Sequence, residues 1–185
     1  IPVPQFGLIT NISNIFELNH DIEITLPEPV FDFDTAGIIL HLMDDSLKTP
    51  LDYTFTKDSL RYRTYRLAYK WEQGTSYTLS IDSAAFRNIY GITSSKLARN
   101  FKTRDENYYG QVLLTFSKVN SPLIVQLLRN DNKETVIKTQ TITADWKVIF
   151  DFLAPEKYIA KIIYDDNNNG KWDSGSFQDK YQPER

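Results

Sequence analysis

The residues from Tyr65 to Ile81 read YRLAYKWEQGTSYTLSI, and this stretch decides the fold class. Apolar or aromatic side chains occupy every second position of its first half, with Arg66, Ala68 and Lys70 between them: Tyr65, Leu67, Tyr69 and Trp71. The second half alternates again from Tyr77 to Ile81, after a turn at Glu72-Gln73-Gly74. Alternation with a period of two is typical of strands with one buried face. The stretch therefore predicts two strands with a short turn between them.

Similar runs recur at short intervals on both sides of this stretch, and no long segment has the 3.6-residue period of a helix. We expect Val148, Phe150 and Phe152 to share one face of a strand, and a single helical turn over Asp82 to Phe86. The expected fold is all-β, built of small antiparallel β-sandwiches of the Ig-like kind. The other predicted strands are Ile22 to Leu26, Ile38 to Met43, Leu97 to Thr103, Val112 to Phe116, Leu123 to Leu128, Glu134 to Ile142, Lys147 to Phe152 and Tyr158 to Tyr164.

A polar, charged break from Arg104 to Asn107 divides the predicted strands into two series. We therefore place one domain at residues 1–104, with residues 1–10 as a lead-in or linker, and a second at residues 105–185. A domain of about 80 residues buries a modest fraction of its surface, so the second domain is expected to need a stabilising staple.

Composition excludes several classes of protein. The 24 acidic and 21 basic residues are interspersed and give a net charge of −3, so the basic excess of a nucleic-acid-binding protein is missing. There is no cysteine, which excludes disulfides and thiolate metal sites. The apolar runs are far too short for a transmembrane helix. Because the chain begins at Ile1 without Met, we interpret it as a fragment or processed form whose targeting signal and further domains lie upstream.

The segment from Asp165 to Asp173, DDNNNGKWD, is the most specific chemical motif. Calcium takes about six to eight oxygen ligands on a tightly turned backbone. Oxygen-bearing side chains at alternating positions followed by Gly170 fit that need. The predicted ligands are the side chains of Asp165, Asn167, Asn169 and Asp173 and the backbone carbonyl of Lys171.

The motif departs from an EF-hand, because Ser176 stands at the twelfth position, where a bidentate Glu is required. A missing ligand then has to come from elsewhere, with Asp179 and Glu184 as candidates. The alternative is a plain polar turn without an ion, since Asp, Asn and Gly form such turns by themselves. In that case Lys171 can neutralise the carboxylates directly.

Nothing in the sequence indicates an active site. His20 and His41 are the two histidines, and neither accompanies a nucleophile motif, a phosphate loop or zinc-ligand spacing. The set Tyr62, Tyr65, Tyr69 and Trp71 has two interpretations: a sugar-stacking platform, or rings half-buried in a sheet. The same two interpretations apply to Trp146 and Trp172. We expect a protein that is not an enzyme.

Two resemblances follow from these motifs. The stretch from Leu18 to Thr103 resembles a bacterial Ig-like domain of S-layer and other surface proteins, on the residues Asp21 to Val30, Gln73 to Ile81 and Asp82 to Gly91. The second half resembles the prealbumin-like or Ig-like β-sandwich repeats of bacterial surface proteins. That resemblance rests on a strand beginning at Gly110, on Leu153 to Tyr158 and on Asp165 to Asp173. Many such repeats have Gly after the proline, where this chain has Glu156.

The combination looks like the C-terminal part of Ig-like cell-envelope lipoproteins of Bacteroidetes. The resemblance implies a non-catalytic structural or binding module at the cell surface or outer membrane, with calcium in the last loop. Its expected partner is the rest of a larger surface protein, and a glycan or another surface protein is a further candidate. The alternatives are a carbohydrate-binding or adhesion module that uses exposed aromatic residues, and an accessory domain of an enzyme whose catalytic part lies upstream.

Overall fold

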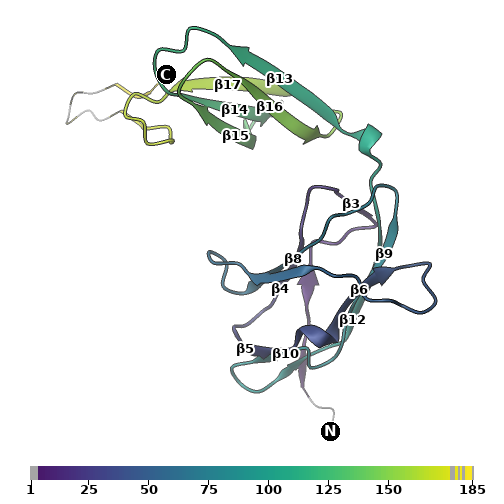
Figure 1. The fold of residues 1–185 in the computed structure, drawn as a ribbon. Coiled ribbons are helices and arrows are strands. Elements are labelled where there is room, and N and C mark those ends of the chain that lie inside the picture. Colours follow the sequence, from purple (N-terminus) through teal and green to yellow (C-terminus); the bar gives the residue numbers. More distant parts are fainter. Residues whose placement is uncertain (1–3, 176–177, 179, 181, 185) are drawn as a thin grey trace. The chain divides into compact units, whose positions relative to one another are not determined.

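The structure is a computed structural model that describes residues 4–175, 178, 180 and 182–184. The chain divides into two compact units, Ile1–Glu106 and Asn107–Arg185. Strands dominate both units, and in the described part of the chain the helical elements are the short 3-10 turns η1 (Thr35–Gly37) and η2 (Glu106–Tyr108). The expected fold class, all-β with small Ig-like sandwiches in tandem, is confirmed (Figure 1).

The first unit contains three four-stranded sheets. The first sheet has the spatial order β1 (Gln5–Phe6), β11 (Thr93–Ser94), β10 (Phe86–Asn88) and β5 (Val30–Phe33). The second has the order β3 (Ile15–Phe16), β12 (Leu97–Thr103), β9 (Ser76–Ile81) and β6 (Ile38–Leu42). The third has the order β2 (Ile9–Thr10), β4 (Ile22–Thr25), β8 (Thr64–Ala68) and β7 (Thr54–Lys57). Most neighbours are antiparallel, as expected. Two pairs differ: β1 runs parallel to β11, and β3 runs parallel to β12. The sequence pattern did not reveal these pairs because each involves a strand of two residues.

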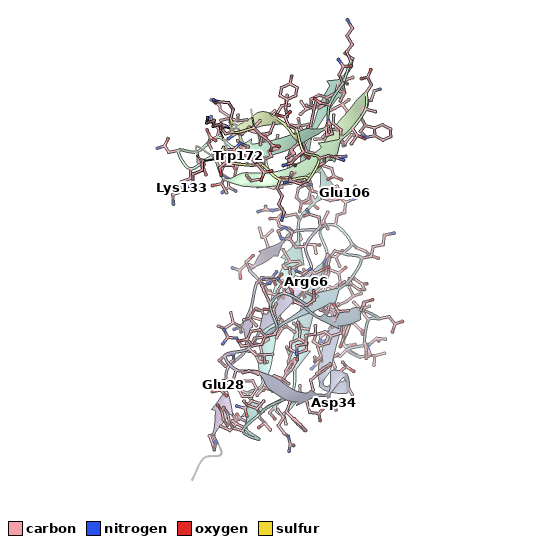
Figure 2. All side chains as sticks on the ribbon, turned by 90° about the vertical axis from the view of Figure 1, so that its left-hand side faces the viewer. Glu28, Asp34, Arg66, Glu106, Lys133 and Trp172 are labelled. Carbon is pink, nitrogen blue, oxygen red and sulfur yellow. The ribbon has the colours of Figure 1, made fainter. Side chains whose placement is uncertain are left out.

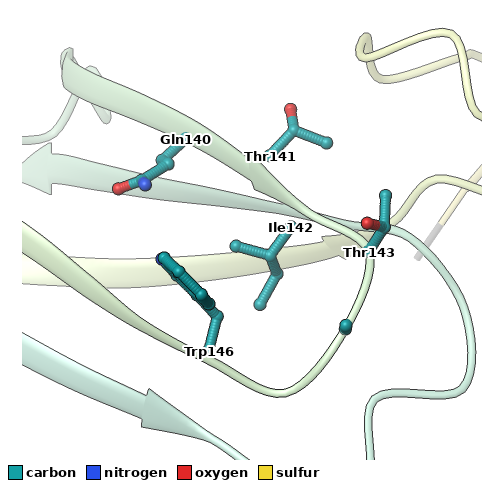
Figure 3. Close-up of a pocket in the computed structure, with 6 residues that line it drawn as sticks. Gln140, Thr141, Ile142, Thr143 and Trp146 are labelled. Atoms are coloured by element: carbon teal, nitrogen blue, oxygen red, sulfur yellow. The ribbon is translucent and has the colours of Figure 1, made fainter.

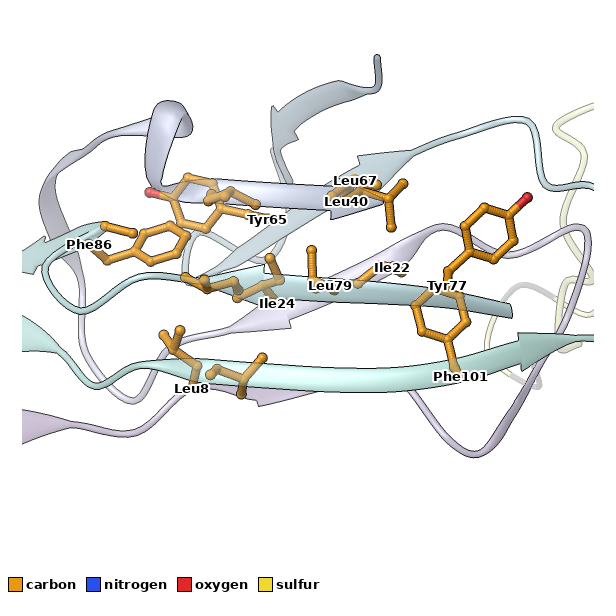
Figure 4. Packing of buried hydrophobic residues seen from close by; sticks show 14 of the residues in the cluster. Leu8, Ile22, Ile24, Leu40, Tyr65, Leu67, Tyr77, Leu79, Phe86 and Phe101 are labelled. Carbon is orange, nitrogen blue, oxygen red and sulfur yellow. The ribbon is translucent and has the colours of Figure 1, made fainter. Parts of the chain in front are cut away.

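The alternating residues of β8 and β9 form the centre of the first core (Figure 4). Leu67, Tyr77 and Leu79 are completely buried, because successive side chains of a strand point to opposite faces and these share the inner one. Trp71 packs edge-to-face on Phe16, Tyr77 and Phe101, with ring centroids 5.4, 5.2 and 5.5 Å away. Such contacts between rings add about 0.5–1.5 kcal/mol per pair beyond the burial of their area.

The helical turn expected over Asp82 to Phe86 is absent, and this prediction was wrong. Ala84 adopts a left-handed backbone with φ of 71°, which a helical turn does not contain. Phe86 begins β10, where it pairs with Phe33 of β5. Pairing with a strand far away in the sequence therefore overrides the local helical signal.

The second unit is a sandwich of two sheets. The first sheet pairs β13 (Gly110–Phe116) with β16 (Trp146–Leu153). The second has the order β15 (Val136–Ile142), β14 (Leu123–Arg129) and β17 (Tyr158–Tyr164). Its buried core comes from three of these strands, β14, β15 and β16: Leu123, Val125, Leu127, Ile142, Val148, Phe150 and Leu153.

Phe152 does not share the inner face of β16 with Val148 and Phe150, so this expectation was wrong. Phe152 has φ of 49°, and the pairing of β16 with β13 shifts register between Gly110 and Val112. An irregularity of this kind changes the face to which later side chains point. Phe152 is consequently 39% exposed, while the next residue, Leu153, is buried.

Strand β17 is incompletely covered. Its residue Ile162 pairs with Val125 of the core, so both side chains lie on the same face of the sheet, yet Ile162 is 45% exposed. Tyr164 pairs with Leu123 in the same way and is 53% exposed. The facing sheet has two strands against three, which leaves this part of the inner face open.

Candidate functional site

The segment from Asp165 to Asp173 begins directly after β17 and turns back on the carboxylate of Asp165. This residue is completely buried, and its N–H donates to the carbonyl of Pro122 at 3.0 Å. Oδ1 accepts a hydrogen bond from the N–H of Asn169 at 3.0 Å, and Oδ2 accepts one from Gly170 at 2.8 Å. Asp165 thus fixes the curvature of the whole turn.

The two predicted asparagine ligands continue this pattern. The side-chain oxygen of Asn167 accepts from the N–H of Asn169 at 3.0 Å, and that of Asn169 accepts from the N–H of Lys171 at 2.8 Å. Both side-chain amide nitrogens donate to Oδ2 of Asp173. The oxygens at positions 165, 167, 169 and 173 therefore lie in one hydrogen-bonded group.

The turn requires left-handed backbone at two positions. Asn168 has φ of 58° and Gly170 has φ of 73°. Glycine has no steric penalty there, and Asn tolerates this region better than most residues. The sequence Asn-Asn-Asn-Gly therefore suits the shape of the loop, with or without an ion.

Glu184 closes the loop from the C-terminal side. Its buried carboxylate accepts hydrogen bonds from the N–H of Asp166 at 3.0 Å and of Asp173 at 2.9 Å. The indole N–H of Trp172, labelled in Figure 2, donates to the carbonyl of Glu184 at 2.9 Å. Both ends of the segment are thus held to one residue.

The structure brings together the side chains of four of the five predicted ligands. Lys171 is exposed and has no ion pair within the described residues, so it does not neutralise the carboxylates of the loop. Of the two candidates for an additional ligand, Glu184 lies against the loop, and Asp179 lies outside the described residues, as does Ser176. Within the described part, no group of three or more His, Cys, Asp or Glu side chains is placed to hold a metal. A cation in this loop has to use amide and carbonyl oxygens as well.

The two carboxylates of the loop differ from the other buried carboxylates in their electrostatics. Asp165 and Glu184 have no basic side chain as an ion-pair partner among the described residues. Buried charges in proteins are normally paired or coordinate a metal, because desolvation of an isolated charge is costly. Within the described residues, backbone N–H groups are the partners of both carboxylates.

The first unit neutralises its own buried carboxylate, Asp58. Oδ1 accepts from the N–H groups of Leu60 at 2.9 Å and Arg61 at 3.0 Å, and Oδ2 contacts the guanidinium groups of Arg61 at 3.0 Å and Arg66 at 2.8 Å. These backbone N–H groups, first that of Arg61, hold the pKa of Asp58 well below its usual range. Hydrogen bonding to Arg61 also lowers the pKa of Glu23. The cluster has a structural explanation and an internal charge balance.

The sequence-based sugar platform does not form. Tyr65 and Trp71 are 2% and 8% exposed and belong to the core, Tyr69 packs against that core, and Tyr62 alone of the four is well exposed. The indole N–H of Trp71 donates to the carbonyl of His20 at 2.8 Å. The ring nitrogen Nδ1 of buried His41 lies 2.8 Å from the carbonyl of Leu42. Tyr65, Trp71 and His41 therefore contribute to the packing and hydrogen bonding of the first unit.

The sequence analysis named Trp146 as a possible sugar-stacking ring but did not locate the hollow beside it. Its lining consists of Gln140, Thr141, Ile142, Thr143, Ala144 and Trp146 (Figure 3). The indole is 62% exposed at the first residue of β16. A tryptophan directly after the polar turn Thr143-Ala144-Asp145 was the available signal, since such a ring cannot be covered by the turn itself.

No protein-family model and no curated protein matches this sequence. Among solved structures, the chain is similar to native alpha-2-macroglobulin from Escherichia coli spanning domains MG0-NIE-MG1. The sequences are 10% identical and the TM-score is 0.42; the match covers 86% of this chain and 65% of that one. In the described part of this chain, no helix has the length and apolar character needed to span a membrane.

Proposed function

We propose that this chain is a non-catalytic structural module of an extracytoplasmic bacterial envelope protein, in which calcium stabilises the C-terminal loop. The observation that carries the proposal is the pair of buried carboxylates, Asp165 and Glu184, which close residues 165–173 without a basic partner among the described residues. The role of the loop is to hold the end of a small sandwich in one shape.

The arrangement of oxygens supports calcium as the cation. Calcium prefers carboxylate, amide and carbonyl oxygens, and the loop places Asp165, Asn167, Asn169 and Asp173 in one connected group. Each of these four side chains accepts one or two hydrogen bonds, and a carbonyl or carboxylate oxygen has more than one lone-pair direction. For calcium to bind, the amide nitrogens of Asn167 and Asn169 have to turn away from Asp173.

The small size of the second unit supports the proposal that a bound ion stabilises its folded state. A hydrophobic core of seven buried residues stabilises a unit of this size only modestly. A ligand that binds the folded state alone stabilises that state by mass action. At extracellular-type dissociation constants of roughly 10⁻³ M, calcium at about 10 mM contributes about 1.4 kcal/mol.

Thermal unfolding with calcium and with chelator tests the proposal. The melting transition of the second unit, followed through its two tryptophans, should rise when about 10 mM calcium replaces chelator, by about 4–8 °C per kcal/mol. Terbium in the loop should show emission sensitised by Trp172, and Asp165→Ala should abolish that emission. Magnesium at the same concentration controls for general ionic effects, because it prefers a rigid octahedral site.

Two results separate the parts of this proposal. If calcium leaves the melting temperature unchanged while the folded state stays intact, the calcium part is wrong and the hydrogen-bonded loop alone is the staple. Hydrolysis of common chromogenic ester, phosphate or glycoside substrates by the purified chain contradicts the non-catalytic part.

A further inference from the structure

The hollow at Trp146 lies at the end of the second sandwich where β15 turns into β16. It has a volume of about 330 Å³. Gln140 and Ile142 of β15 pair with Val125 and Leu123 of the core, so their side chains belong to the inner face. In Figure 3 both project into the same space as the ring of Trp146, between β15 and β16. The hollow is therefore an opening between the two sheets with an indole along one wall.

The indole of Trp146 lacks the hydrogen bond that the other two indoles have. The indole N–H groups of Trp71 and Trp172 donate to the carbonyls of His20 and Glu184, both at short distance. Within the described residues, the N–H of Trp146 has no such acceptor. An exposed ring with a free donor at its edge is available to a ligand from solution.

The polar side chains around this ring are also free of internal partners. In the described part of the chain, the carboxamide of Gln140 and the hydroxyls of Thr141 and Thr143 make no hydrogen bond. None of the described residues that line the hollow carries a charge. The site thus offers neutral donors and acceptors beside an aromatic face. This combination suits a neutral polyhydroxylated ligand, whose axial C–H groups pack on the ring while its hydroxyls bond to the amide and hydroxyls.

The turn between β15 and β16 is held in place. Asp145, which lies between the lining residues Ala144 and Trp146, accepts a hydrogen bond from the N–H of Val119 at 2.7 Å. This bond and one from the N–H of Lys118 lower the pKa of Asp145. Because the carboxylate faces these amides, it anchors the turn to the neighbouring loop. A wall that is fixed before binding loses less entropy when a ligand arrives.

We propose that the hollow beside Trp146 binds one ring of a neutral oligosaccharide, with the sugar stacked on the indole and hydrogen-bonded to Gln140 and Thr143. The volume is at the lower end of the range of about 300–1,000 Å³ that is usual for small-molecule sites. This fits one sugar unit with the rest of the chain in solvent. The lining residues of the hollow are different from residues 165–173 of the proposed calcium site. The two proposals can therefore be tested independently.

Saturation-transfer NMR with four neutral oligosaccharides tests the proposal: cellohexaose, maltohexaose, mannohexaose and the hexamer of N-acetylglucosamine. At least one should receive saturation from the full chain. Trp146→Ala should weaken its binding about tenfold or more, because it removes the aromatic face on which the sugar stacks. Trp146→Phe should retain part of the affinity, and Gln140→Ala should weaken binding with the ring in place.

Two controls distinguish specific binding at this site from non-specific binding of sugars or apolar molecules. Tyr62→Ala removes another exposed aromatic ring, in the first unit, and should leave binding unchanged. N-acetyl-leucine amide probes a purely apolar pocket. The proposal is overturned if none of the four sugars binds, if Trp146→Ala binds as well as the original chain, or if the leucine amide binds at the hollow while the sugars do not. Circular dichroism of each variant confirms that its fold is intact.

Discussion

Asp58 in the first unit and Asp165 in the second are both buried carboxylates that accept two backbone N–H groups. Asp58 also contacts the guanidinium groups of Arg61 and Arg66. Asp165 instead shares its loop with a second buried carboxylate, that of Glu184, because both accept hydrogen bonds from backbone N–H groups of that loop. Each carboxylate organises a turn through these N–H groups. The difference is the source of positive charge: the first turn contains it, and the second lacks it within the described residues. From this comparison we predict that the two units respond differently to cations.

Replacement of Asp165 should have the largest effect. Asp165→Ala removes the acceptor for the N–H groups of Asn169 and Gly170 and should cost about 2–3 kcal/mol of the unfolding free energy of the second unit in calcium. Denaturant unfolding followed by fluorescence of Trp146 and Trp172, with Trp71 replaced by Phe, measures this loss.

Asp165→Asn sharpens the same comparison through the size of the loss in two conditions. It keeps the size of the side chain but removes the charge and one of the two acceptors of backbone N–H groups, so it should destabilise the unit in both conditions and by more in calcium than in chelator. The same loss in both conditions contradicts a role for a cation. Asp58→Asn is the matched control, and its effect should be independent of calcium because arginines already neutralise Asp58.

Acid should act on the first unit through Asp58 and Glu23. Their pKa values are lowered in the folded state, so the unfolded state binds more protons as the pH falls. Their stabilisation is complete above the unfolded pKa of about 4 and is lost as the pH falls below it toward the folded values. Unfolding of a variant that retains only Trp71, measured between about pH 5 and 2, should show this loss. Asp58→Asn should flatten the profile, and an unchanged profile contradicts the assignment.

Arg66→Ala should have the smallest effect. The guanidinium is largely exposed and contributes one of the two charges beside Asp58, while Arg61 retains its own contacts. Exposed ion pairs typically contribute about 0.2–1 kcal/mol. Thermal unfolding at low and high salt measures the effect, which should shrink with added salt. If Arg66→Ala lowers the unfolding free energy as much as Asp165→Ala does, the proposed difference in positive charge between the two turns is contradicted.

The long strands were predictable from sequence because each buries one face of a regular alternation. The runs around Leu67, Leu79 and Phe101 show this clearly, and all three residues lie in the core. Strands of two residues, such as β1 and β3, carry no such pattern and form only where a distant partner is present. The register shift beside Phe152 likewise depends on pairing with Gly110 and cannot be derived from local spacing.

The oxygen-rich loop was predictable because its composition and glycine are local features. The closure by Glu184 depends on eleven intervening residues between it and position 172, so it could be named only as one candidate. The sugar platform failed because the same alternation that forms a strand also buries Tyr65 and Trp71. Exposure of Trp146 depends on how the two sheets end, which the sequence does not encode locally.

The parallel pairing of β3 with β12 has a mechanical consequence. The two strands are neighbours in space but lie near opposite ends of the sequence of the first unit. The backbone N–H groups of Lys102 and Arg104 donate to the carbonyls of Asn14 and Phe16, both at 3.0 Å. When tension pulls the two ends apart, parallel neighbours slide along each other, so all bonds between them bear load together. An antiparallel pair at the same place would open one bond at a time. The first unit is therefore built to resist stretching along the chain.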